Sequence, residues 1–251
     1  MLAVLVRKDL LIEFRSREIL ISMITFGAAI TLLYAFSFRP SPESMLTFAP
    51  GLMWMVFLFV SVLALHRSHS LEKEFDAFSM ILSAPVERSV LFISKYLSGF
   101  IFLVVAQMVL LPLFFLFLQL PLPANLAQMV AVFLLVDLGI SAAGSLLSGI
   151  VMRVRVNEML LPLMLFPMVT PLLISAVKST ASIMDNQPFN QWKLWFQLIV
   201  SFVIVFSLIG YLVYDYVSEE CWSRFIPGKV QRSWPVFSLF FGLLYSILSS
   251  M

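Results

Sequence analysis

The sequence predicts an all-α, polytopic membrane protein with six transmembrane helices and a possible seventh. Hydrophobic residues make up 61% of its 251 residues and charged residues only 12%, whereas about 25% of residues are charged in soluble domains. The mean hydropathy is +1.00. The long apolar stretches do not alternate apolar and polar positions, as the strands of a membrane barrel would. The bilayer is therefore the solvent for most of the chain, and helices are the elements that cross it.

Six apolar stretches reach the length of about 20 residues that a helix needs to cross about 30 Å of hydrocarbon. In chain order they cover residues 19–38, 47–65, 96–118, 126–150, 159–177 and 194–214. In the second stretch, Pro50 and Gly51 are expected to start the span near its outer end. A seventh stretch, residues 234–251, is marginal, and it either crosses the membrane or rests in the interface.

The distribution of lysine and arginine predicts a cytoplasmic N-terminus. With that orientation, 13 of the 16 basic residues lie in cytoplasmic segments, as the positive-inside rule requires. Only Arg39, Lys178 and Lys193 fall in outside loops. This asymmetry accounts for the net charge of +2, so no nucleic-acid partner is indicated. The charged start of the chain is not typical of a cleavable signal peptide.

The chain divides into three predicted parts. Residues 1–18 are expected to form a helix along the cytoplasmic face, because Leu2, Val6, Leu10 and Phe14 recur every four residues. A charged extension of the first transmembrane helix is the alternative. Residues 19–217 form the six-helix transmembrane domain, and residues 218–251 form a cytoplasmic segment with the possible seventh membrane helix.

A short amphipathic helix is predicted after the second span, at about residues 71–84. An apolar stripe with helical spacing is formed by Leu71, Phe75, Phe78 and Leu82, the charged Glu72, Lys73 and Asp76 lie on the other side, and Pro85 ends the helix. About 12 residues are too few to span a membrane. The segment is therefore shaped to dock in a groove of a cytoplasmic partner. The alternative is a loop helix that lies on the lipid surface, which its acidic residues disfavour.

Asp137 is the candidate residue inside the membrane. A carboxyl group twelve residues into a predicted span is costly in lipid, so it faces protein or water. It shares a face of small and polar residues with Ser141, Gly144, Ser145 and Ser148, which allows helices to approach closely. Both a role in the translocation path or in partner contact and a role in helix packing fit this pattern.

Three prolines, Pro162, Pro167 and Pro171, are expected to interrupt and bend the fifth span. A broken helix at membrane depth is tolerated where it is buried against protein or lines a cavity. The spacing fits a conformational hinge and a static kink equally well.

Sequence motifs of enzymes and nucleotide binding are missing from the chain. It contains no G-x-x-x-x-G-K-[ST], H-E-x-x-H, G-x-S-x-G or C-x-x-C, so no enzyme activity is predicted and any ATPase activity would belong to another chain. His66 and His69 could ligate heme or a metal, but their position fits solvated residues at the edge of a loop better. Cys221 is the only cysteine, and it fits an inert residue better than a reactive thiol or a metal ligand. We therefore predict no bound cofactor and no metal site.

Several segments resemble known families. The stretch EKEFDAFSMILSAPVERSVLFISK (residues 72–95) is similar to the cytoplasmic loop of ABC-2-type permeases that forms the coupling helix. RKDLLIEFRSREIL (7–20), APGLMWMVFLFVSVLAL (49–65) and NEMLLPLMLFPMVTPLL (157–173) resemble signatures of the CcmB family, and the resemblance covers roughly residues 5–220. There are two departures from that family. It often has a glycine near the start of the coupling helix, whereas this chain has no glycine between Gly51 and Gly99, and the tail beyond Glu220 is longer than usual.

The resemblance implies the membrane permease subunit of an ABC transporter that serves heme export and delivery in c-type cytochrome biogenesis, in the bacterial inner membrane. Heme would be its substrate and ATP would bind to a partner. The implied partners are a CcmA-like ATP-binding subunit, CcmC-like and CcmD-like heme-handling subunits, a CcmE-like heme chaperone, a second copy of the chain and membrane lipid. The resemblance leaves open whether the subunit moves heme or remodels the heme-handling complex, and the lack of outer-face histidines slightly favours remodelling.

Two other interpretations stay open. One is an ABC-2-type exporter of a lipid, glycan or drug, and the other is a non-transporting membrane scaffold.

Overall fold

The computed structural model describes residues 5–11, 17–37, 42–74, 88–151 and 160–223. The chain separates into two units, Met1–Ser218 and Glu219–Met251. Of the second unit, only residues 219–223 at the end of the last helix are described. The predicted seventh stretch and residues 75–87 lie outside the described residues.

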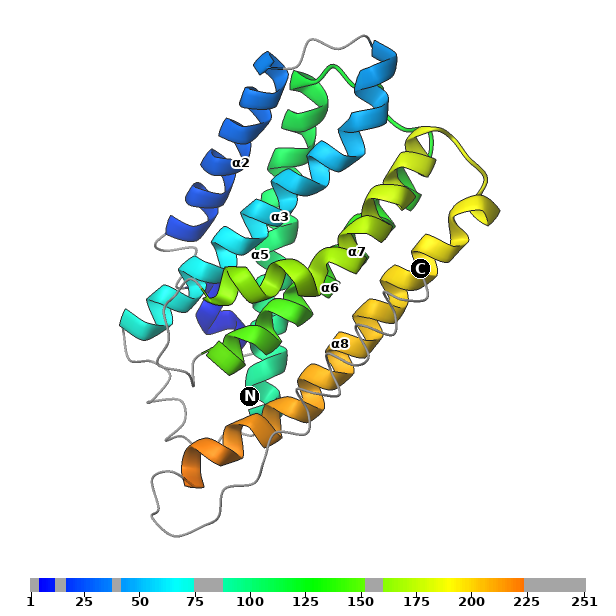
Figure 1. Ribbon diagram of the computed structural model, residues 1–251. Helices are drawn as coiled ribbons and strands as arrows, with labels where there is room; N and C mark the ends of the chain where they lie inside the picture. Colours follow the sequence, from blue (N-terminus) through cyan, green and yellow to red (C-terminus); the bar gives the residue numbers. More distant parts are fainter. Residues whose placement is uncertain (1–4, 12–16, 38–41, 75–87, 152–159, 224–251) are drawn as a thin grey trace. The chain divides into compact units, whose positions relative to one another are not determined.

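Six long helices make up the described part of the first unit, together with a short helix at residues 5–11 (Figure 1). They are α2 (Glu18–Ser37), α3 (Pro42–Glu74), α5 (Arg88–Phe117), α6 (Leu126–Val151), α7 (Leu160–Met184) and α8 (Phe189–Ser223). Each is long and apolar enough to cross a membrane. The described residues contain no strand. The predicted all-α polytopic membrane fold with six spans is therefore confirmed.

Five of the six long helices are longer than the apolar stretches that predict them, and α2 has the same length, 20 residues, as its stretch. α5 begins eight residues before residue 96, α7 ends seven residues after 177, and α8 extends beyond its stretch at both ends. An apolar stretch measures the part of a helix inside the hydrocarbon, whereas the backbone hydrogen bonds continue into the polar flanks. The expected start of the second span at Pro50 and Gly51 is wrong, because α3 begins at Pro42 and Pro50 lies inside it.

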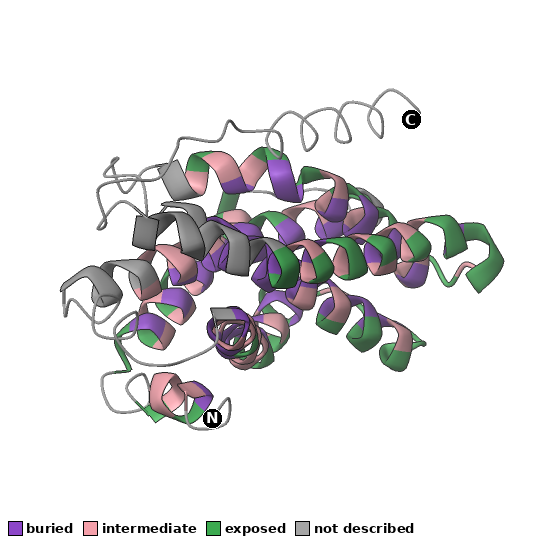
Figure 2. Ribbon diagram, turned by 90° about the horizontal axis from the view of Figure 1, so that it is seen from below, coloured by how far each residue is buried: buried purple, intermediate pink, exposed green. Residues whose placement is uncertain are grey.

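α6 is the most buried of the spanning helices. It contacts α5, α7 and α3, while α2 packs against α3 and α5. In α6 72% of the span is buried, against 17% in α8, and Figure 2 shows the buried residues in purple along the sides where helices meet. Small residues such as Ala142 and Ala143, both 0% exposed, explain the position of α6, because they let neighbouring helices approach closely.

α5 and α7 end with the same type of cap. Gln119 and Asn186 adopt φ angles of 53°, and the N–H groups of the residues that follow, Leu120 and Gln187, bond to carbonyls five residues back at 3.1 and 2.9 Å. This is the Schellman arrangement, which satisfies carbonyls left free at a helix end. The cap of α7 allows the tight connection to α8.

Candidate functional site

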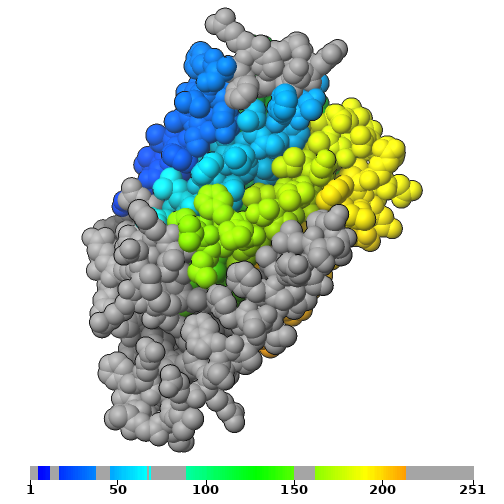
Figure 3. All heavy atoms as spheres, viewed as in Figure 1, coloured from blue at the N-terminus to red at the C-terminus, as the bar shows by residue number. Residues whose placement is uncertain are grey.

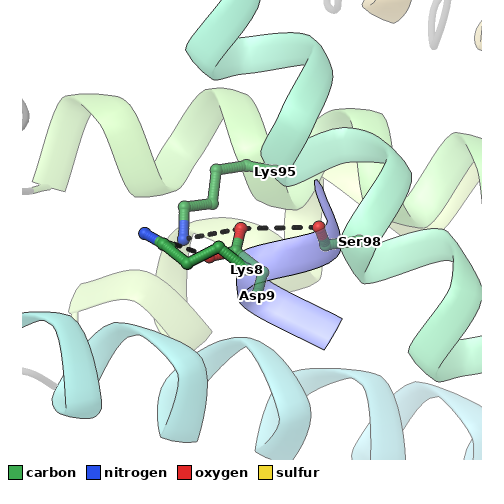
Figure 4. A network of polar contacts seen from close by, with 4 residues as sticks. All are labelled: Lys8, Asp9, Lys95 and Ser98. Atoms are coloured by element: carbon green, nitrogen blue, oxygen red, sulfur yellow. Dashed lines mark hydrogen bonds and ion pairs between the residues drawn. The ribbon is translucent and has the colours of Figure 1, made fainter. Parts of the chain in front are cut away.

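The first turns of α5 hold the helix at residues 5–11 through a cluster of charged and polar side chains (Figure 4). The Asp9 carboxylate lies between two lysines, with its Oδ2 3.4 Å from Lys95 Nζ and its Oδ1 3.4 Å from Lys8 Nζ. The Ser98 hydroxyl donates to Asp9 Oδ2 at 3.4 Å. The Asp9 side chain is only 12% exposed, so this cluster is a partly buried anchor rather than a surface ion pair.

Helical spacing explains why these side chains meet. Val6, which is 8% exposed, and Asp9 are three residues apart, and so are Lys95 and Ser98 on α5. Residues three apart lie on the same side of a helix. The short helix therefore turns one apolar and one acidic residue toward α5.

The next residue of α5, Tyr96, connects to two further helices. Its carbonyl accepts a hydrogen bond of 2.6 Å from the Ser141 hydroxyl of α6, and its phenol oxygen accepts one of 3.4 Å from Ser207 of α8. Residues 95–98 of α5 thus contact the short helix, α6 and α8 within one turn. We call this turn the α5 junction.

Two glycines allow the close approach of helices at the α5 junction. A Cβ atom on Gly99 would lie 2.7 Å from Ser141 Oγ, and one on Gly210 of α8 would run into the ring of Phe92. In both places the added Cβ atom would come closer than van der Waals contact. A larger side chain at Gly99 or Gly210 would therefore force the helices apart.

The α5 junction lies close in sequence to the predicted docking segment. Residues 71–74 are the last turn of α3, and the rest of that segment, including Phe75, Asp76, Phe78, Leu82 and Pro85, lies outside the described residues. α5 begins at Arg88. The predicted segment, which ends at Pro85, is thus separated from the start of α5 by only two residues in the sequence.

Asp137 is fully buried in α6, as expected for a carboxyl group within a span. It is 1% exposed, and its Oδ1 accepts a hydrogen bond of 2.7 Å from Gln107 Nε2 of α5. Its Oδ2 has no hydrogen-bond partner among the described residues. Gln107 was not among the predicted site residues, although an amide within an apolar stretch is a recognisable signal for such a partner.

The small face of α6 packs against neighbouring helices. Ser141 and Ser145 are 1% and 4% exposed, and a Cβ on Gly144 would lie 2.5 Å from Leu65 Cδ1 of α3. These contacts fit the helix-packing role of this face. Its role in a translocation path stays a prediction.

Pro167 and Pro171 lie inside α7 as expected, whereas Pro162 lies in its first turn. Pro162 does not interrupt the helix, because α7 begins at Leu160 and first-turn N–H groups have no partner within a helix. Pro167 and Pro171 do lie inside α7, which continues through both to Met184. α5 contains a further internal proline, Pro112, that we did not predict as a site of bending.

A second buried contact joins α3, α6 and α7. The Trp54 indole N–H donates to Thr180 Oγ1 at 3.0 Å, and the Trp54 ring stacks on Phe133 with centroids 4.9 Å apart. A buried tryptophan usually has an acceptor for its N–H, but the sequence does not indicate which residue provides it for Trp54.

His66 is not part of a metal site among the residues that the structure describes, and the side chain of His69 lies outside them. No group of three or more His, Cys, Asp or Glu side chains that could hold a metal is found within residues 5–223 where these are described. His66 lies near the end of the second span.

The described helices and their buried polar contacts are those of a multi-pass membrane protein, and the sequence pattern of the CcmB protein family matches residues 1–213. The chain belongs to the CcmB protein family. Two similar relatives are proteins called heme exporter protein B. The one from Rhodobacter capsulatus is 27% identical over 151 residues, which cover 60% of this chain and 69% of the relative. The one from Pseudomonas aeruginosa is 23% identical over 194 residues, which cover 77% and 86%.

The CcmB match includes all elements of the candidate site. It contains the short helix at residues 5–11, the α5 junction, the Gln107–Asp137 pair and all of α7. It ends at residue 213, ahead of the last turns of α8. The site therefore lies in the part of the chain that is common to this family.

Proposed function

We propose that this chain is the membrane permease subunit of an ABC complex for heme export and delivery in c-type cytochrome biogenesis. The observation that carries the proposal is the match to the CcmB protein family over residues 1–213. Two relatives called heme exporter protein B and the six-span helical fold support it.

In this proposal a separate CcmA-like subunit binds and hydrolyses ATP, because the sequence has no P-loop. The ATPase contacts residues 71–85 on the cytoplasmic side. Its motion passes into α5, which starts three residues later at Arg88. The α5 junction then distributes the motion, because Asp9, Ser141 and Ser207 connect the same turn to three other elements. Coupling requires contacts that differ between two states, and a rigid docked element can supply them.

We assign ligation of heme iron to partner subunits. The chain has only two histidines, His66 and His69, and they lie at the end of the second span that the positive-inside rule places in the cytoplasm. The complex would contain two copies of this chain and two ATPase subunits, with CcmC-like, CcmD-like and CcmE-like proteins that handle heme. Its location is the bacterial inner membrane.

The test measures covalent heme in c-type cytochromes on heme-stained gels of membranes. The strains are a deletion of the gene, the complemented deletion, and the deletion that carries Phe75→Asp with Phe78→Asp. The matched control carries Lys73→Asp with Ser83→Asp, which places two aspartates on the polar side of the predicted helix. The proposal predicts loss of c-type heme in the deletion and in the first double variant, and retention in the control.

Other outcomes would separate the alternatives. Normal c-type heme in a deletion strain without a second copy of the gene would exclude the heme pathway and leave an exporter of a lipid, glycan or drug. Loss in the deletion, with normal heme and normal ATPase association in the Phe75 and Phe78 variant, would favour a scaffold that does not couple ATP hydrolysis.

A further inference from the structure

The carboxyl group of Asp137 lies near the middle of α6, 11 residues after the start of the helix and 14 before its end. α6 packs against α5, α7 and α3, and a Cβ atom on Gly139 would lie 3.3 Å from Phe202 Cδ1 of α8. On the face shown in Figure 3, α3 in cyan and α7 in light green lie side by side. Asp137 is 1% exposed, so neither lipid nor a partner subunit reaches it in this packing.

The two oxygens of the Asp137 carboxyl group have different surroundings. Oδ1 accepts the 2.7 Å hydrogen bond from Gln107 Nε2 of α5, whereas Oδ2 is buried and has no hydrogen-bond partner among the described residues. An ionised carboxylate has about four lone-pair sites and only accepts hydrogen bonds. When it is buried, it needs several donors or a nearby cation. The single amide donor of Gln107 does not meet that requirement.

The helices around Asp137 offer it no counter-charge in the described part of the chain. Asp137 forms no ion pair there, and α6 contains no other charged residue. The spans of α3, α5, α7 and α8 contain six basic or titratable residues, which are His66, Lys95, Tyr96, Lys178, Lys193 and Tyr211. Lys178, Lys193 and Tyr211 are exposed on the outside of their helices, so three groups remain to be considered.

These three groups lie far from Asp137 along their helices. On α5, Lys95 and Tyr96 lie at least 11 residues before Gln107, which is about 16 Å. His66 lies at the end of the α3 span, and the residue before it meets α6 seven residues beyond Asp137, which is about 10 Å along the helix. An ionised Asp137 would therefore be an isolated charge inside the bundle.

A protonated carboxyl group fits these surroundings better. In the neutral acid, Oδ1 is a carbonyl oxygen that accepts from Gln107, and Oδ2 carries the proton and becomes a donor. The carbonyl oxygen of the same Gln107 amide is a suitable acceptor, because the terminal bonds of both side chains rotate with little restriction. A neutral acid and a primary amide can thus pair through two hydrogen bonds, of which the structure shows one. A carboxylate has no donor for the second.

We propose that Asp137 and Gln107 form a proton-binding site between α5 and α6, with the proton bound to Asp137 Oδ2 in the packed protein. A buried carboxyl group without a counter-charge takes up a proton from water, because the neutral acid is less costly to bury than the charge. Separation of α5 from α6 would admit water, and the proton would then return to it, as in an exposed carboxyl group. This inference does not depend on heme or on ATP coupling, because it follows from burial and hydrogen bonding alone.

Infrared spectroscopy of the full-length protein, purified at neutral pH in a detergent without ester groups, tests the proposal. A protonated carboxyl group absorbs at a higher wavenumber than carboxylates and amides, and its band shifts in heavy water. The wild type is compared with Asp137→Asn, which keeps an oxygen that can accept from Gln107 and has the shape of the neutral acid. The matched control is Asp185→Asn, because Asp185 is exposed just beyond the end of α7.

The proposal predicts that Asp137→Asn loses one band of a protonated carboxyl group and that Asp185→Asn keeps it. Loss of carboxylate absorption alone in Asp137→Asn would overturn the proton site, and would mean that a bound cation or water stabilises an ionised Asp137. Gln107→Leu provides a second test if Asp137→Asn does not accumulate. Removal of the donor to Oδ1 should move the band to a higher wavenumber, and an unchanged spectrum in this region would also overturn the proposal.

Discussion

Asp137 and Gln107 form the most buried polar contact between α5 and α6. The two side chains share a hydrogen bond of 2.7 Å in a place where no water reaches Asp137, which is 1% exposed. A buried polar group that loses its partner costs more than the hydrogen bond contributes when both partners are present. At the scale of single residues, the structure is therefore most sensitive to changes that break one half of a pair.

Replacing Gln107 by Leu is expected to lower the stability of the protein by about 1–3 kcal/mol, because it leaves Asp137 buried without its donor. Thermal unfolding of the detergent-purified protein measures the change. Gln197→Leu is the matched control, since Gln197 lies exposed on α8, and little change is expected there. Adding Asp137→Leu to Gln107→Leu should recover part of the loss. Equal loss in Gln107→Leu and Gln197→Leu would contradict the role of this pair.

Exchanging the charges of Asp9 and Lys95 tests the anchor of the short helix. Asp9→Lys places three lysines together and Lys95→Asp places two carboxylates together, so each single variant is expected to lose about 1–3 kcal/mol. The double variant restores opposite charges at two positions whose native charged atoms lie 3.4 Å apart, and it should be more stable than either single variant. Thermal unfolding measures all three. Arg7→Glu, at an exposed position, controls for charge change alone, and a double variant less stable than both singles would rule out the anchor.

At the scale of helices, glycine positions decide how closely two elements approach. Gly210 places α8 directly on the Phe92 ring of α5, while a Cβ on Gly51 of α3 would have no atom within 4 Å. The same residue type therefore serves close packing in one helix and has no packing role in the other. The prolines of α7 show a similar division, because Pro162 only begins the helix while Pro167 and Pro171 change its hydrogen bonding.

Gly210→Ala is expected to destabilise the protein by about 1–3 kcal/mol, because the added methyl group overlaps a ring that α5 holds in place. Gly51→Ala should be neutral or stabilise by up to about 1 kcal/mol, since alanine has the higher helix propensity. Thermal unfolding of the two variants compares them directly. A Gly210→Ala protein as stable as Gly51→Ala would mean that α8 does not rest on Phe92 as described.

At the scale of the whole molecule, charge and hydropathy define how the chain threads the membrane. In the predicted topology, successive connections between the six described spans lie on opposite sides of the membrane, and basic residues concentrate on one of these sides. The fold class and the number of described spans could thus be predicted from the sequence. The contacts Lys95–Asp9, Gln107–Asp137 and Trp54–Thr180 could not, because partners up to 126 residues apart meet only once helices have packed with a given rotation.

The native Cys221 gives a direct test of orientation. With a cytoplasmic N-terminus, Cys221 follows the sixth span on the cytoplasmic side, so an impermeant maleimide should label it only after spheroplasts are lysed. A cysteine in place of Asn186, in the connection between α7 and α8, should be labelled in intact spheroplasts in the Cys221→Ser background. The reverse pattern would invert the predicted topology and move the docking segment to the outer side.

The sequence by itself determined that this is a helical membrane protein with six spans in its described part, because crossing hydrocarbon requires about 20 apolar residues at a time. Its kinship with the CcmB family came from the resemblance of particular segments and from the family match. The sequence also marked Asp137 as buried. Only the tertiary structure decided which side of each helix faces the bundle, and so which of the prolines in α7 lie on an exposed face. The physical reason is that lipid is as apolar as the protein interior. An apolar residue therefore fits either side of a spanning helix, and the hydrophobic pattern that orients helices in soluble proteins carries no such information here.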